Sequence, residues 1–305
     1  MIGEVLVKGA AAGLMLAALL ACAPARAEEA HGRPLARPRV VSLNLCTDEL
    51  ALRLADPGQV LSVTHLARDP LASNVADIAR DVPVNRGLAE EVVPLKPDLV
   101  LAGAYTTRTA TAVLRRLGFE VLELTEPQTL DEAYAQIRMV AARLGVPERG
   151  AAMVRGMKEA FARLPPVAGP RPTAVVLRPN GFTTGRGSLA DELMEKAGLT
   201  NLAAQLPTDK MGQLALEEIV RAAPDLVVVN ADEAAPPSLA DALLHHPALA
   251  PFKDRTLALP LKLWTCAGPD LAEAAAQLAA ARARLAGPEA ARPAPIHHAS
   301  AEGVR

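Results

Sequence analysis

Two stretches of the chain decide its fold: residues 88–105, LAEEVVPLKPDLVLAGAY, and residues 214–232, LALEEIVRAAPDLVVVNAD. In each stretch a glutamate, Glu90 or Glu217, stands seven residues before a proline, and Asp-Leu-Val follows that proline. The apolar run that then begins is unbroken, which is typical of a strand in a parallel sheet with both faces covered. Because Glu217 comes 127 residues after Glu90, the copies predict two similar α/β lobes rather than a solenoid repeat.

Strands and helices alternate around the first copy. The sequence predicts strands at 39–43, 60–63 and 120–124, and a helix at 109–117 that ends at Gly118. Thr47 is expected to cap the helix that follows the first strand. This alternation is the pattern of a parallel sheet.

The middle of the chain is helical. A capping box of Thr129 and Glu132 opens a helix that stops at Gly145, and Pro147 opens a second one. A strand at 173–177, a helix capped by Ser188, a strand at 256–259 and a helix at 269–285 follow. We therefore expect a signal peptide (1–27), an N-terminal segment (28–38), an N-terminal α/β lobe (39–126), connecting helices (127–166), a C-terminal α/β lobe (167–286) and a disordered tail (287–305).

The N-terminus predicts export. Lys8 precedes an apolar run that is too short to span a membrane, and Ala25-Arg26-Ala27 fits the small-x-small cleavage rule of signal peptides. Leu-Leu-Ala before Cys22 resembles a lipobox, so lipidation of Cys22 is an alternative processing route. The expected location is the periplasm.

The composition excludes some classes of function. The net charge of −2 at pH 7 does not predict a nucleic-acid surface. No nucleophile–base pair, metal-ligand cluster or phosphate-binding loop is recognisable, so we do not predict an enzyme. A two-lobed periplasmic enzyme stays as the alternative from another class, because fold alone does not decide function.

Four segments together resemble a known family: RVVSLNLCTDEL from Arg39, LAEEVVPLKPDLVLAG from Leu88, GFTTGRGSLADELMEKAGLTNLA from Gly181 and ALEEIVRAAPDLVVVN from Ala215. The chain resembles the helical-backbone class (class III) of periplasmic substrate-binding proteins of ABC importers, which bind vitamin B12, ferric siderophores or haem. The resemblance implies two α/β lobes with mainly parallel sheets, a long backbone helix that joins them and a ligand cleft between them. It also implies a monomer without a cofactor of its own that delivers its ligand to an inner-membrane permease and ATPase.

Two sets of residues are candidates for these interactions. The resemblance implies that Glu90 and Glu217 dock onto arginines of the permease. Ligands of open α/β sheets bind beyond the carboxyl ends of the strands. This rule selects Asn44, Cys46, Thr47, His65, Arg68, Arg86, Tyr105 and Thr106 in the first lobe, and Arg178, Asn180, Phe182, Asn230 and Trp264 in the second.

The kind of ligand follows from these side chains. Tyr105 and Trp264 can cover a flat ligand, and Arg68, Arg86 and Arg178 can bind carboxylates. A ferric siderophore or similar metal chelate is therefore favoured, cobalamin is next, and haem is third, with Tyr105 or His65 as an axial ligand. A bare metal ion is not expected, because the ordered region has few histidines: His65, His245 and His246.

Cys46 and Cys266 come from opposite lobes. A disulfide between them is conceivable in an oxidising compartment, but it would lock the cleft shut. The expectation is therefore two thiols or a redox-sensitive pair.

Overall fold

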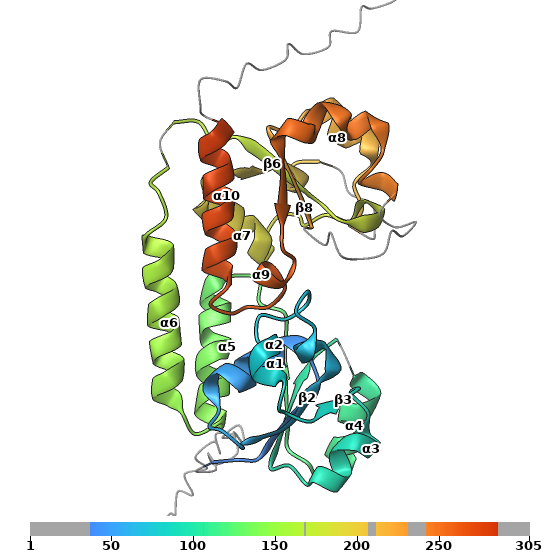
Figure 1. The fold of residues 1–305 in the computed structure, drawn as a ribbon, viewed down its shortest axis with the longest axis vertical. Coiled ribbons are helices and arrows are strands. Elements are labelled where there is room, and N and C mark those ends of the chain that lie inside the picture. The colour runs from blue at the N-terminus through green and yellow to red at the C-terminus, as the bar shows by residue number, and fades with distance from the viewer. Residues whose placement is uncertain (1–36, 106, 168, 207–211, 231–241, 286–305) are drawn as a thin grey trace, which may run out of the picture. The chain divides into compact units, whose positions relative to one another are not determined.

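The computed structural model describes residues 37–105, 107–167, 169–206, 212–230 and 242–285. Two parallel sheets are its framework (Figure 1), with the strand orders β3-β2-β1-β4-β5 and β7-β6-β8-β9. The first sheet comprises β1 (Val40–Ser42), β2 (Val60–Thr64), β3 (Val84–Asn85), β4 (Leu99–Gly103) and β5 (Val121–Leu124). The second comprises β6 (Thr173–Leu177), β7 (Thr200–Asn201), β8 (Leu226–Asn230) and β9 (Thr256–Leu259).

Helices connect and cover these strands. The first lobe contains α1 (Leu45–Leu54), α2 (Ala76–Ala79), α3 (Ala89–Val92) and α4 (Arg108–Arg116), and the second contains α7 (Leu189–Lys196), α8 (Leu216–Ala222), α9 (Lys262–Thr265) and α10 (Leu271–Leu285). Between them lie α5 (Leu130–Arg143) and α6 (Pro147–Ala162). The fold is thus the predicted one, two α/β lobes with parallel sheets.

The strands are apolar throughout because both faces of each sheet are covered. In β4, Leu99 and Leu101 belong to a large core that also contains side chains of α5, α6, α10 and the second sheet. Val100 and Ala102 point to the opposite face and pack with residues of α3 and α4. In β8, Leu226 and Val228 join the same large core, while Val227 packs with Ile219 of α8 on the far face. Alternation of faces therefore explains the unbroken apolar runs.

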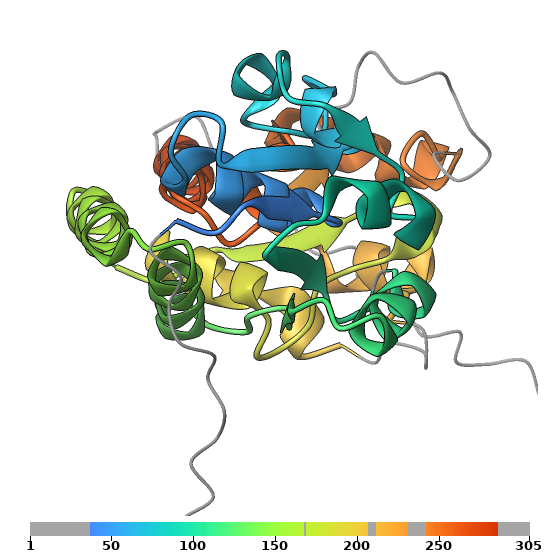
Figure 2. The same cartoon turned by 90° about the horizontal axis from the view of Figure 1, so that it is seen from below.

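The connection between the lobes is a pair of helices. α5 and α6 pack side by side (Figures 1 and 2), and a turn through Gly145, which has a φ of 77°, joins them. Thr129 Oγ1 accepts the Glu132 N–H at 3.2 Å, so the predicted cap is confirmed. The residue pattern predicted these two helices. They stand in place of the single long helix that the family resemblance implied.

Two local predictions need correction. Thr47 does not cap α1, because Asn44 accepts the Cys46 N–H at 3.0 Å and the helix begins three residues earlier than Thr47 would have allowed. Asparagine and threonine are both good N-cap residues, so residue type alone does not decide between them. β3 and β7 were not predicted, since two-residue strands carry no periodic signal.

Some predictions concern residues outside the described ones. These are the signal peptide (1–27) with Cys22, the tail (287–305) and Thr106. None of the helices in the described ranges has the length and hydrophobicity needed to cross a membrane.

Candidate functional site

Polar side chains gather at the carboxyl edge of the first sheet, as the strand-end rule predicted. Asn44, His65 and Arg86 follow β1, β2 and β3, which are neighbours in the sheet, and Tyr105 follows β4 on the other side of β1. His65 and Arg86 are exposed, and Tyr105 is 77% exposed. A phenol this exposed at a strand end is available for contact with a ligand.

A groove of about 910 Å³ lies between α3 and α4, beside this edge. Arg86, Tyr105 and Glu90 line it together with exposed apolar residues that include Leu88 and Leu117. Three predicted functional residues therefore share one concave surface of the first lobe. A second, polar hollow of about 180 Å³ in the other lobe contains none of the predicted residues.

The carboxyl edge of the second sheet brings together Arg178, Asn230 and Trp264. Arg178 follows β6, Asn230 ends the adjacent β8, and Trp264 lies in α9 just after β9. The Arg178 guanidinium carbon lies 5.8 Å from the centre of the Trp264 ring, within cation–π range. Trp264 is 6% exposed, so its ring is largely enclosed in this structure.

Buried polar atoms without partners mark this edge. Arg178 Nε, Asn230 Oδ1 and Trp264 Nε1 have no hydrogen-bond partner among the described residues. Burial lowers the pKa of Arg178, and Glu126 opposes that shift. An unpaired buried polar group costs about 1–3 kcal/mol, so a ligand that pairs with these atoms would gain that free energy. Two donors and one acceptor in a row are suited to a ligand that carries carboxylate or amide groups.

Asn180 and Phe182 lie in the loop after β6. Both are exposed, and the Asn180 carbonyl accepts the Gln213 side-chain N–H at 2.9 Å. Glu90 and Glu217 are likewise exposed and lie in the first turns of α3 and α8. The structure thus places these four predicted residues on the surface.

Two predicted ligand residues have structural roles instead. Thr47 is 1% exposed, and its hydroxyl lies 2.8 Å from the Asn44 carbonyl and 2.7 Å from Ser42 Oγ. Arg68 donates to the backbone carbonyls of Ala79 and Val82, at 3.2 and 2.7 Å, and so holds the segment around α2. The Thr47 hydroxyl is therefore buried and paired inside the lobe, whereas Arg68 is exposed and uses Nε and Nη2 to hold the backbone.

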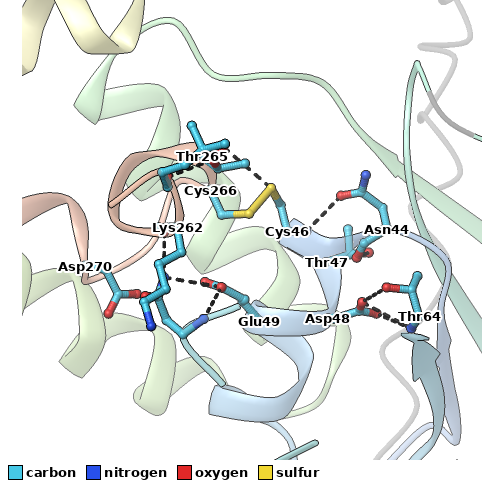
Figure 3. Close-up of a disulfide and its surroundings, with 12 residues drawn as sticks. Asn44, Cys46, Thr47, Asp48, Glu49, Thr64, Lys262, Thr265, Cys266 and Asp270 are labelled. Carbon is cyan, nitrogen blue, oxygen red and sulfur yellow. Dashed lines mark hydrogen bonds between the residues drawn. A yellow bond between two sulfur atoms is a disulfide. The ribbon is translucent and has the colours of Figure 1, made fainter. Parts of the chain in front are cut away.

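The cysteine prediction was wrong. Cys46 in α1 and Cys266 after α9 form a disulfide, with 5.0 Å between their Cα atoms (Figure 3). Sequence alone favoured two thiols because a bond was expected to lock the lobes. Cys46 is therefore a link between the lobes, and its sulfur is not a ligand-binding thiol.

Two buried acids beside this disulfide were missed as functional candidates. Asp48 accepts the Thr64 N–H at 3.1 Å and its hydroxyl at 2.5 Å (Figure 3), and burial raises the pKa of Asp48 to about 6. Glu49 accepts the Asn74 N–H at 2.9 Å, and burial, followed by the nearby Asp270, raises the pKa of Glu49. Asp48 lies in the first turn of α1 and Glu49 directly after it. Carboxylates usually face solvent, so the sequence carried no signal for their burial.

Within the described ranges, no group of three or more His, Cys, Asp or Glu residues has the arrangement of a metal site. What the two sheet edges offer is an exposed phenol and histidine on one lobe and an enclosed Arg–Trp–Asn row on the other. Such a set can bind an organic ligand through hydrogen bonds and ring contacts.

Comparisons with known proteins agree with this fold. The family model described as "Periplasmic binding protein" matches residues 40–253, and the chain belongs to that family. A cobalamin-binding protein of Halobacterium salinarum is 29% identical over 202 residues, which are 64% of this chain and 54% of that protein. A Bacillus subtilis ABC transporter substrate-binding lipoprotein is 26% identical over 205 residues, 63% of each chain. The match thus spans about half of the cobalamin-binding protein and somewhat under two thirds of the lipoprotein.

Solved structures match over more of the chain. The haem-binding protein RhuT from Roseiflexus sp. RS-1 has a TM-score of 0.69 and 25% identity, over 82% of this chain and 100% of its own. The haem-binding protein BhuT, solved with two haems, has a TM-score of 0.66 and 25% identity, with the same coverage. The family and these relatives are named for binding and transport rather than for catalysis.

Proposed function

We propose that this protein is the solute-binding component of an ABC importer. It would be exported to the periplasm, capture a small molecule there as a monomer, and deliver it to a permease that an ATPase drives. Membership of the periplasmic binding protein family and the B. subtilis relative support this role. Cell fractionation of the native host tests the location, and lipid labelling of a Cys22→Ser variant tests whether that residue is lipidated.

For the ligand, we propose a metal tetrapyrrole. Haem and cobalamin share a flat macrocycle that carries carboxylate or amide side chains. The observation that carries this proposal is the buried row of Arg178, Trp264 and Asn230, whose unpaired atoms suit such side chains. Tyr105 supplies an exposed phenol, and a tyrosine oxygen is a known axial ligand of haem iron. The names of the relatives, which bind cobalamin or haem, support the same class.

A ferric siderophore becomes the second candidate. The preference for an anionic chelate was based on three arginines, and Arg68 is occupied by backbone carbonyls. Arg86 and Arg178 still favour a carboxylate-bearing chelate, so this ligand class belongs in the same test.

Titration of the purified protein with hemin, cyanocobalamin and a ferric hydroxamate ranks the three ligands. Trp264 is the only tryptophan, so its fluorescence reports on one known place. We expect saturable quenching by hemin or cyanocobalamin and none by the hydroxamate. Saturable binding of the hydroxamate alone would replace the tetrapyrrole proposal with the siderophore.

Two substitutions locate the ligand. Arg178→Ala should weaken tetrapyrrole binding ten- to a hundredfold, or by about 1–3 kcal/mol. Arg221→Ala is the matched control, because Arg221 is exposed and pairs only with Glu218 among the described residues. Tyr105→Phe should change the absorption spectrum of bound haem and leave cobalamin binding unaltered. Equal affinities of the Arg178 and Arg221 variants would show that the ligand lies elsewhere.

A further inference from the structure

The short helix α9 is held by the opposite lobe. At its start, the Lys262 carbonyl accepts the Asn74 side-chain N–H at 2.7 Å, and Lys262 Nζ donates to the Pro70 carbonyl at 2.9 Å. Just after its end, Cys266 is joined to Cys46. Four residues further on, Asp270 pairs with Arg53 of α1 at 2.7 Å. The segment 262–270 is therefore connected to the first lobe at three places, of which Figure 3 shows the disulfide.

These contacts with the first lobe add to the packing of α9 against α10 of its own lobe. Helix α9 has four residues, and so short a helix has almost no stability by itself. Trp264 lies in this helix, between the Asn74 tie and the disulfide. The Arg178 guanidinium, 5.8 Å from the ring centre, is therefore aligned with a ring whose place depends on contacts from the other lobe.

We propose that the Cys46–Cys266 disulfide and the Asn74–Lys262 hydrogen bond position Trp264 and, through it, the ligand edge of the second lobe. The cysteines are positioning residues and do not touch the ligand. The oxidised pair holds Trp264 enclosed beside Arg178, and reduction lets α9 move. The consequence for affinity rests on the proposed tetrapyrrole function, whereas the position of Trp264 belongs to the ligand-free protein.

The first test uses the ligand-free protein. Dithiothreitol breaks the S–S bond by a two-electron reduction, each sulfur takes up a proton, and the reductant closes to its cyclic disulfide. We expect the Trp264 emission to move to longer wavelength and acrylamide quenching to increase severalfold, with unchanged far-ultraviolet circular dichroism. A Cys46→Ser/Cys266→Ser variant should show the emission of the reduced protein, and dithiothreitol should not change that emission.

The second test measures affinity with hemin as the probe. Comparing the double serine variant with the oxidised protein keeps thiol reductants away from the haem iron. The variant should bind about tenfold more weakly, a difference of about 1.4 kcal/mol. Asn74→Ala keeps the disulfide and should shift the emission in the same direction by a smaller amount, which provides a readout if the double variant folds poorly.

A matched control separates positioning from general stability. Gln59→Ala should lower the melting temperature without touching α9, because the Gln59 side chain bonds only to the Asp56 N–H and the Leu144 carbonyl among the described residues. It should leave Trp264 emission and hemin affinity unchanged. Identical emission of the oxidised, reduced and double serine proteins would overturn the proposal even if hemin binds. A shift in emission without any tetrapyrrole binding would support positioning and refute the proposed ligand.

Discussion

The two copies of the repeated stretch have the same backbone conformation and hydrogen bond at Pro-Asp, but different side chains surround them. The residue before each Pro-Asp is left-handed: Lys96 has a φ of 47° and Ala223 a φ of 46°. The aspartate then accepts a backbone N–H at the start of the neighbouring strand. Asp98 accepts from Arg39 and Asp225 from Thr173, both at 2.8 Å. Pro-Asp therefore aligns the central strand pair of each sheet.

The surroundings of these aspartates differ. The Arg39 side chain also donates to Asp98, at 3.1 Å from Nε, and this hydrogen bond, with that of the Arg39 backbone, lowers the pKa of Asp98. In the second copy the Thr173 hydroxyl takes the place of the arginine, at 2.9 Å. The repeat thus preserves backbone geometry, while the side chains of each lobe serve that lobe's own contacts.

The largest effect should come from the strands that the copies share. Leu99→Ala and Leu226→Ala each remove a leucine that is 2% exposed in the same core, and each should cost about 2–5 kcal/mol of unfolding free energy. Urea denaturation measures both. A cost in one copy below about 1 kcal/mol would show that the two strands are not equivalent in the core.

The next effect distinguishes the first helices of the lobes. Burial raises the pKa of Asp48 in α1 to about 6, whereas Asp191 and Glu192 at the same place in α7 are only half-buried. Between pH 4 and 6 the folded chain keeps a proton that the unfolded chain has released, so stability falls as the pH rises through this window. The change amounts to at most about 3 kcal/mol.

Asp48→Asn should remove this slope, since asparagine does not titrate and can still accept the Thr64 N–H. The charge of His65 opposes the shift of the Asp48 pKa, so the comparison is made in a His65→Gln background. Parallel stability curves for the protein and the variant from pH 4 to 7 would contradict the assignment.

A smaller effect concerns the two Pro-Asp aspartates. Asp98→Ala and Asp225→Ala each remove hydrogen bonds to a charged acceptor and should cost about 1–3 kcal/mol. Because the pKa of Asp98 is lowered, its contribution is present at neutral pH and is lost as the pH falls below about 4. Thermal unfolding at pH 7 and pH 3 should show a smaller acid loss in the Asp98 variant than in the unaltered protein.

The smallest effect on stability should come from the glutamates of the copies. Glu90 and Glu217 are exposed, so replacing both with Ala should change stability by less than about 0.5 kcal/mol. If they dock onto the permease, uptake in the native host should nevertheless be lost while ligand affinity is kept.

The adjacent glutamates are the control for this prediction. Glu91 accepts the Arg86 N–H at 2.8 Å, and Glu218 pairs with Arg221 at 2.6 Å. Both carboxylates therefore form contacts inside this protein. Their replacement should lower stability and leave uptake intact. Normal uptake by the Glu90/Glu217 variant would remove the docking assignment.

Much of the fold could be predicted because its signals are local. The strands of both copies, the Ser188 and Thr129 caps and the two connecting helices lie within a residue or two of the expected places. Apolar runs, helix caps and helix-ending glycines act over a few residues, so the local sequence is enough to predict the elements. The sequence also predicted correctly that Tyr105, Arg178 and Trp264 lie at the carboxyl edges of the sheets.

The sequence by itself therefore determined that there are two α/β lobes, the order in which their strands follow one another along the chain, and the residues at the strand ends. Only the tertiary structure decided that Cys46 and Cys266, 220 residues apart, are bonded, that Arg68 is occupied by backbone carbonyls and that Asp48 is buried. Each of these depends on distances between segments remote in the chain. The type of a residue determines which interactions it can form, but the packing of the lobes determines which partner lies close enough to form them.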